Sequence, residues 1–255
     1  MSDPGSNLID MSLFLVGGRP FPHTKALDEV YETYCAQAKD YLRGEGKVVL
    51  FLLGDPANLD DRNVKEQPEY VSLLTSHWPE AQLETVWLKG DPTEVEFPDE
   101  ESICGIIVGP SMPGTVNKYV TVHKQKFNRL VSAGVPYLGF SAGSAVVAKN
   151  AIVGGWKSNG HQITTPEAAY GFEEIEIEDG LGLIGPSVET HTDARSCMGR
   201  AIEAMLVGKM ASVVAIDEAT CLIVTPNGRT QIAGAGRVAW LSRAGEHVDI
   251  RFESA

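Results

Sequence analysis

The sequence predicts an α/β fold in which helices cover both faces of a mostly parallel sheet. In the first half of the chain, short, continuously apolar segments alternate with amphipathic segments of helical period. Such apolar runs are typical of strands buried on both faces. The second observation is the apolar run 135–140, which leads directly into a serine flanked by glycines. The third is the tail 221–252, where the Asn227-Gly228 turn between apolar stretches predicts an antiparallel C-terminal extension.

The elements can be justified in chain order from these periodicities and from their start and stop signals. Thr24 is expected to cap the first helix and Gly44 to end it, while Gly134 and Gly208 end two later helices. The expected helices are 24–43, 66–78, 116–133 and 196–207. The expected strands are 12–16, 48–53, 83–88, 105–108, 135–140, 172–179, 187–190 and 213–216, followed by the antiparallel tail.

Composition limits the classes of partner. The chain has 255 residues, 43% hydrophobic and 22% charged, which suits one globular domain over 1–255 with residues 1–11 as a flexible lead-in. A net charge of −13 argues against nucleic acid or an anionic membrane as partner. The four cysteines form no Cys-x-x-Cys pair, and the polar N-terminus does not read as a signal peptide. We therefore expect a cytoplasmic protein with reduced, mostly buried thiols and without a cofactor or metal.

Residues 139–143 read Gly-Phe-Ser-Ala-Gly, a Gly-x-Ser-x-Gly pattern between an apolar strand and a small, helix-compatible stretch, 144–148. This is typical of a nucleophile elbow, a sharp turn that exposes the hydroxyl of Ser141 above a sheet. Because the turn is tight, a Cβ atom at Gly139 or Gly143 would clash with neighbouring strands. Free N–H groups of the next helix point toward the site. The pattern alone also allows a turn that merely closes the fold or holds a phosphate.

A serine nucleophile needs a histidine base, which in turn is oriented by a carboxylate. Asp217 and Glu218 end an apolar strand and offer that carboxylate. The order Ser141, Glu218, His247 would match α/β-hydrolases, whereas Ser141, His191, Glu218 would be a second order. Spacing favours His191, because it ends a strand while His247 lies in the antiparallel tail. The six histidines are His23, His77, His123, His161, His191 and His247.

Three segments, in this order, are similar to motifs of one family. Residues 139–144 read Gly-Phe-Ser-Ala-Gly-Ser, His191 is followed by Arg195 and Arg200, and residues 216–220 read Ile-Asp-Glu-Ala-Thr. Together they resemble the dipeptidase E and cyanophycinase family of serine peptidases, relatives of class I glutamine amidotransferases. An amidotransferase itself is not expected, because those enzymes carry cysteine where this chain has a serine at the elbow.

The resemblance implies a flavodoxin-like fold, with Ser141 as nucleophile, His191 as base and Glu218 as the acid that orients it. Members of the family cleave peptide or isopeptide bonds next to aspartyl residues, and basic residues hold the substrate carboxylate. Arg195 and Arg200 match such positions, with charge on a helix surface as the alternative for both.

One segment departs from the family, which has Gly-Gly at the end of the strand expected here at 105–108. Residues 108–114 read Val-Gly-Pro-Ser-Met-Pro-Gly here, and Pro110 has no N–H to donate. Gly109 and Gly114 remain as sources of an oxyanion donor, and we expect Gly109 to act with Ala142, the residue after the serine. The Gly-Asp-Gln of cyanophycinases is also missing, which argues against cyanophycin as the substrate.

The resemblance therefore implies a serine-type dipeptidase that acts on small acidic peptides, and a homodimer is left open. Two alternatives are kept. One is a catalytically weak relative that binds a small acidic ligand. The other is an esterase of the α/β-hydrolase type that uses Ser141, Glu218 and His247.

Overall fold

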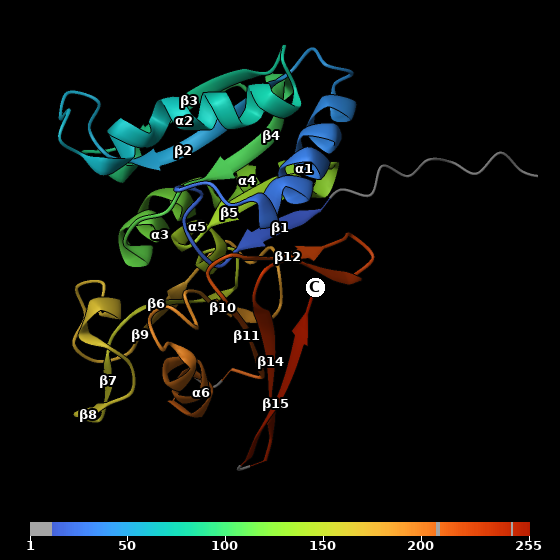
Figure 1. Cartoon of the computed structure of the whole chain (residues 1–255). Helices are drawn as coiled ribbons and strands as arrows, with labels where there is room; N and C mark the ends of the chain where they lie inside the picture. Colours follow the sequence, from blue (N-terminus) through green and yellow to red (C-terminus); the bar gives the residue numbers. More distant parts are fainter. Residues whose placement is uncertain (1–11, 208–209, 246) are drawn as a thin grey trace, which may run out of the picture.

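The computed structural model describes residues 12–207, 210–245 and 247–255, and its centre is a seven-stranded sheet (Figure 1). The lead-in expected at 1–11 and the helix stop expected at Gly208 lie outside the described residues. The strand order is β13-β12-β1-β5-β4-β2-β3, in which β1 to β5 run parallel and β12 and β13 are antiparallel. The bounds are β1 (Leu13–Val16), β2 (Lys47–Leu53), β3 (Gln82–Leu88), β4 (Ile103–Val108), β5 (Tyr137–Phe140), β12 (Thr220–Val224) and β13 (Thr230–Gly234).

Helices cover both faces of this sheet, so the predicted α/β class with a mostly parallel sheet is confirmed. Helices α1 (Asp28–Tyr41) and α2 (Arg62–His77) bury their apolar side chains in one core layer. Helices α3 (Pro113–Val122), α4 (Lys124–Ala133) and α5 (Ala142–Ala145) form the other layer. No helix in the described part of the chain is long and apolar enough to cross a membrane.

A second sheet has the order β10-β11-β14-β15 and packs against α6 (Met198–Val207) (Figure 1). Its strands are β10 (Ser187–Glu189), β11 (Ser212–Ile216), β14 (Arg237–Ala244) and β15 (His247–Ser254). The antiparallel tail is thus divided, since β12 and β13 extend the main sheet while β14 and β15 extend the second one. The sequence predicts these strands but not their partners, because alternation along a strand does not specify its neighbour.

Several boundaries differ from the prediction for local reasons. The stretch 116–133 forms two helices because the backbone turns at His123, between α3 and α4. Helix α2 begins earlier than expected because the Asp61 side chain accepts the N–H of Asn63 as a helix cap. Thr24 precedes a 3₁₀ turn, and its side chain makes no cap hydrogen bond. The short strands are β6 (Asn150–Gly154) with β9 (Glu176–Asp179), and β7 (Lys157–Ser158) with β8 (His161–Gln162). The 3₁₀ turns are Lys25–Leu27, Pro92–Glu94, Glu100–Ser102 and Pro166–Ala168.

The elbow helix α5 has only four residues and lies directly against the end of β4. A Cβ atom on Gly143 would lie 2.1 Å from the Val108 carbonyl oxygen, and one on Gly139 would lie 2.7 Å from the Gly143 backbone. The two glycines therefore permit the close approach of helix and strand, as the pattern predicts. All four cysteines are buried and unpaired.

We predict that Gly143→Ala destabilises the protein, because backbone must shift to admit the Cβ atom. Overpacking of this kind costs about 1–3 kcal/mol. Gly185→Ala is the matched control, since a Cβ atom there meets nothing within 4 Å and its φ is not positive. Urea denaturation measures both changes. An unchanged midpoint for Gly143→Ala would contradict the close approach.

Candidate active site

Ser141 lies at the carboxyl end of β5, in a backbone conformation that few side chains adopt. Its φ is +50° and its ψ is −105°, and it is the residue before α5. Its N–H donates to the Val16 carbonyl at 3.0 Å, which fixes the turn to the neighbouring strand β1. Non-glycine residues in such conformations cost of order 1–3 kcal/mol and cluster at functional sites. A strained residue at a strand-to-helix turn is the conformation that the Gly-x-Ser-x-Gly pattern leads us to expect.

His191 comes from the loop after β10 and reaches the serine across the two sheets. Its Nε2 lies 2.7 Å from Ser141 Oγ, and both residues are buried. The backbone N–H of His191 donates to the Gly17 carbonyl at 3.0 Å, and its φ of +54° is again in the left-handed region. Two strained residues therefore face each other, each tied by its backbone to the end of β1.

Glu218 lies behind His191, in the turn between β11 and β12. Its Oε2 lies 3.2 Å from His191 Nδ1, but the two groups are not aligned as a hydrogen bond. At this separation the carboxylate can still orient the imidazole, because catalytic contacts are often loose before substrate binds. The His191 contact, ahead of the charges of Arg195 and Arg19, holds the pKa of Glu218 below its ordinary value, although burial raises it.

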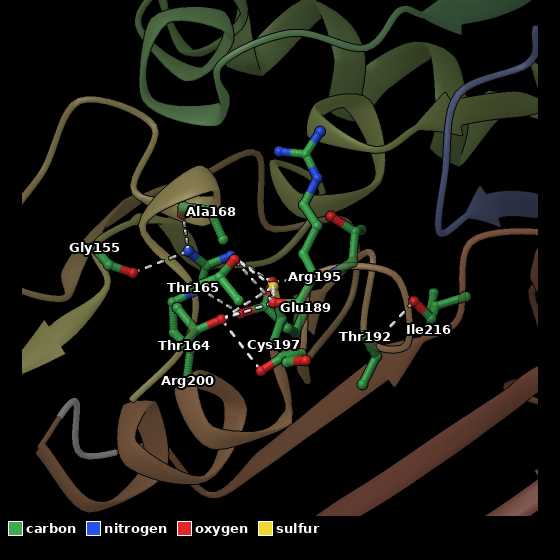
Figure 2. Close-up of polar contacts among 12 residues, drawn as sticks. Gly155, Thr164, Thr165, Ala168, Glu189, Thr192, Arg195, Cys197, Arg200 and Ile216 are labelled. Atoms are coloured by element: carbon green, nitrogen blue, oxygen red, sulfur yellow. Dashed lines mark hydrogen bonds and ion pairs between the residues drawn. The ribbon is translucent and has the colours of Figure 1, made fainter. Parts of the chain in front are cut away.

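The turn that carries Glu218 is fixed by the histidine loop. Asp193 Oδ1 accepts the Glu218 N–H at 2.9 Å, and Thr192 Oγ1 donates to the Ile216 carbonyl at 3.1 Å (Figure 2). The neighbouring Asp217 instead accepts the backbone N–H of Arg237 and is mostly buried. Of the two acidic residues, only Glu218 therefore lies against the histidine.

The expected pair of oxyanion donors is only half present. The N–H of Ala142 has no acceptor in the described part of the chain and lies at the start of α5. The expectation for Gly109 is wrong, because its N–H donates to the Phe51 carbonyl at 2.9 Å, as part of the sheet. An N–H that already donates to a carbonyl within the sheet is not available to an oxyanion.

The expectation that Arg200 holds the substrate carboxylate is wrong, because its guanidinium is buried and paired with Glu189. It is 2% exposed, and its Nε and Nη2 atoms contact the two Glu189 oxygens at 2.7 and 2.9 Å (Figure 2). Its Nη1 donates to the carbonyls of Gly155 and Ala168. Burial disfavours the charged form, but the Glu189 carboxylate outweighs it and raises the pKa of Arg200. Through this ion pair Arg200 joins α6 to β10, the strand that precedes His191.

Arg195 is the arginine that remains near the site. It is partly exposed, and its side chain points away from the Glu189–Arg200 pair (Figure 2). Its Nη1 donates to the Glu167 carbonyl at 3.1 Å, and its guanidinium lies 5.4 Å from the Tyr170 ring centre. Its backbone N–H donates to the His191 carbonyl at 2.9 Å, so Arg195 lies one turn of chain from the histidine, and its charge contributes to the lowered pKa of Glu218.

The order Ser141, Glu218, His247 is contradicted. His247 is exposed at the turn of the β14–β15 hairpin, where it pairs with Ala244. Figure 1 shows this hairpin extending away from α5. The hydroxyl of Ser141 contacts His191 instead.

Sequence reasoning missed three polar residues around the site. Ser144 Oγ lies 2.8 Å from both the Val16 and Gly139 carbonyls and joins β1 to β5. Arg19 follows the Gly17-Gly18 pair, and Asn63 lies in the first turn of α2. The signal available for Arg19 was the glycine pair after an apolar strand. A Cβ atom on Gly18 would lie 2.5 Å from the Glu218 side chain, so this segment passes close to the site.

An apolar hollow of about 540 Å³ lies elsewhere, lined by Leu13, Leu183, Val214, Leu222 and Trp240 among others. Leu13 begins β1, so this hollow lies at the amino-terminal ends of the parallel strands, whereas Ser141 lies at their carboxyl ends. The candidate site is thus defined by side-chain geometry at the carboxyl ends of the strands, which is where sites form in such sheets.

The chain is similar to known proteins in sequence and in fold. Over 141 residues, the chain is 34% identical to the cyanophycinases of Trichormus variabilis and of Nostoc sp. strain PCC 7120. That match covers 55% of this chain and 41% of each cyanophycinase, so the chain spans well under two thirds of these curated relatives. No family model matches the chain.

Solved structures extend the likeness in fold. A peptidase from an acI-B1 Actinobacterium has a TM-score of 0.64 at 15% identity, over 96% of this chain and 95% of that one. A candidate peptidase E from Listeria monocytogenes EGD-e has a TM-score of 0.53 at 14% identity, over 89% and 100%. These matches show the fold, a flavodoxin-like α/β arrangement. The resemblance to the dipeptidase E and cyanophycinase family is supported by the sequence match to the cyanophycinases.

We predict that replacing the two arginines destabilises the protein to very different extents. Arg200→Ala should lower the free energy of unfolding by about 3–5 kcal/mol, because it leaves the buried Glu189 carboxylate unpaired. Arg195→Ala should change it by less than about 1 kcal/mol, as substitutions near the surface do. Urea denaturation of both variants measures the difference. Equal and small losses would show that the buried pair does not stabilise the fold.

Proposed function

We propose that this protein is a serine hydrolase that cleaves peptide bonds of small aspartyl peptides. The observation that carries the proposal is the 2.7 Å contact between Ser141 Oγ and His191 Nε2 at a strained elbow. Glu218 behind the histidine supports the same assignment. The names of the relatives, cyanophycinase and peptidase, support hydrolysis of a peptide-type bond.

The proposed reaction has two halves. His191 Nε2 takes the hydroxyl proton of Ser141 as the oxygen attacks the substrate carbonyl, and Glu218 stabilises the resulting imidazolium. The oxyanion of the tetrahedral intermediate accepts the Ala142 N–H. When the C–N bond breaks, the imidazolium gives its proton to the leaving amine, and an acyl-serine remains. Water then attacks this ester with His191 as base, which releases the acid and restores the Ser141 hydroxyl.

An acidic substrate needs a local positive charge, since the chain carries a net charge of −13. Arg195 supplies it, because its side chain is partly exposed and its backbone N–H donates to the His191 carbonyl. A guanidinium can hold a carboxylate through two parallel hydrogen bonds. We therefore assign Arg195 to the aspartyl side chain of the substrate.

A second candidate is a protein that binds acidic ligands without turnover. Pro110 and the committed N–H of Gly109 favour it, because both positions of the family's donor segment are lost. Thermal stabilisation by aspartate or acidic dipeptides, without hydrolysis and without labelling by a fluorophosphonate, would favour this candidate over the hydrolase.

We predict that a fluorophosphonate labels Ser141 and that Ser141→Ala abolishes both labelling and hydrolysis of Asp-X dipeptides. His191→Ala should lower kcat by at least about 10⁴, because the serine loses its base. His247→Ala is the matched control, and it should retain full activity since that residue lies on a distant hairpin. Full activity of His191→Ala would exclude the proposed triad.

We predict that Arg195→Ala weakens selection for the aspartyl carboxylate. A hydrogen bond to a charged group contributes about 1.5–3 kcal/mol, so kcat/KM for Asp-X should fall about 10- to 100-fold relative to Asn-X. Arg129→Ala removes the same charge from the exposed face of α4 and serves as the control. A preference for Asp-X that survives in Arg195→Ala would remove this residue from the substrate site.

A further inference from the structure

We infer that the second oxyanion donor is the backbone N–H of Ser111, aimed by the side chain of Asn63. This inference rests on the proposed function, since an oxyanion hole has a role only if Ser141 attacks a substrate carbonyl and is acylated. Pro110 cannot donate, and Gly109 already donates to Phe51. Ser111 is the next residue of the same segment. Its N–H has no acceptor among the residues that the structure describes, and the residue is partly exposed.

Asn63 fixes the direction of the peptide group between Pro110 and Ser111. Its Nδ2 donates to the Pro110 carbonyl at 3.3 Å and to the Leu53 carbonyl at 2.7 Å, so it joins the ends of β4 and β2. In a trans peptide the carbonyl and the following N–H point in opposite directions. With the Pro110 oxygen turned toward Asn63, the Ser111 N–H is turned away from it.

That direction is toward the face of the sheet that carries α5. Asn63 belongs to α2, which covers one face of the sheet, whereas α3 and α5 cover the other face. Helix α5 touches the Val108 carbonyl, just before the Gly109–Ser111 segment. The Ser111 N–H therefore points to the face on which α5 begins with the free N–H of Ala142.

The orientation of the Asn63 amide is itself determined. Arg19 Nη2 lies 3.0 Å from Asn63 Oδ1, and because a guanidinium only donates, the amide oxygen must face it. The amide nitrogen then faces the two carbonyls. Glu66 holds Arg19 at 2.6 Å and also accepts from Arg62 Nε at 2.6 Å, so the arginine is fixed in turn. Asn63 and Glu66 are both buried.

Asn63→Asp tests the inference most sharply, because it keeps the size and the contact to Arg19 but removes both N–H donors. We expect kcat for Asp-X hydrolysis to fall about 10- to 100-fold, below the 10²–10³ that complete loss of a donor costs. KM should stay within about twofold. Affinity for a peptide boronate, whose tetrahedral adduct occupies the oxyanion hole, should fall in parallel with kcat.

Asn128→Asp is the matched control. Its amide also donates to two backbone carbonyls, those of Lys124 and Leu181 at 2.8 and 2.9 Å, but on α4 and away from Ser141. This variant should lose stability and keep kcat. Ser111→Pro, which deletes the N–H itself, should lower kcat about 10²–10³. If Ser111→Pro fails to fold, the boronate affinity of Asn63→Asp still decides.

Two results would overturn the inference. One is wild-type kcat and boronate affinity in folded Asn63→Asp. The other is a gain in kcat of about 10² on Pro110→Ala, which would show that the site lacks a second donor. A wild-type protein that neither hydrolyses Asp-X nor reacts with a fluorophosphonate would contradict the proposed function as well. Labelled wild type with an unaffected Asn63→Asp variant contradicts this inference alone.

Discussion

The candidate site depends on the close packing of α5 against the end of β4. Gly139 and Gly143 allow it, because a side chain at either position would overlap backbone. With helix and strand in contact, the chain has room for only one residue between β5 and α5, and Ser141 takes a φ of +50° there. The strain at Ser141 is offset by the packing of the surrounding layers. This backbone conformation directs the Ser141 hydroxyl toward His191, in the loop after β10.

The second sheet places the partners of the serine. Parallel pairing of β10 with β11 brings the ends of both strands to one edge, so the loop of His191 lies beside the turn of Glu218. Two hydrogen bonds join these segments directly: Thr192 donates to the Ile216 carbonyl, and Asp193 accepts the N–H of Glu218. The buried Glu189–Arg200 pair holds the strand just before His191 to α6. The histidine is thus fixed from both sides, which limits its movement relative to Ser141.

The sequence predicts those features that depend on local pattern. Buried strands, the glycine-flanked elbow and the strand-end positions of His191 and Glu218 all follow from residues near in sequence. The errors concern what a residue contacts across the fold. The position of Arg200 in its motif gives no sign of a buried Glu189 opposite it, and Gly109 gives no sign of the sheet hydrogen bond that uses its N–H. Asn63 lies far from the motifs in sequence, and its contact with Pro110 appears only in the folded chain.

The central claim is that Ser141 becomes covalently acylated during turnover. The most direct measurement is rapid acid quenching of the protein with an aspartyl ester, followed by mass spectrometry of the peptide that contains Ser141. The account predicts that one aspartyl group is added to that peptide within the first turnover and is then lost by hydrolysis. Turnover of the ester without any adduct, or with an adduct on another residue, would contradict it.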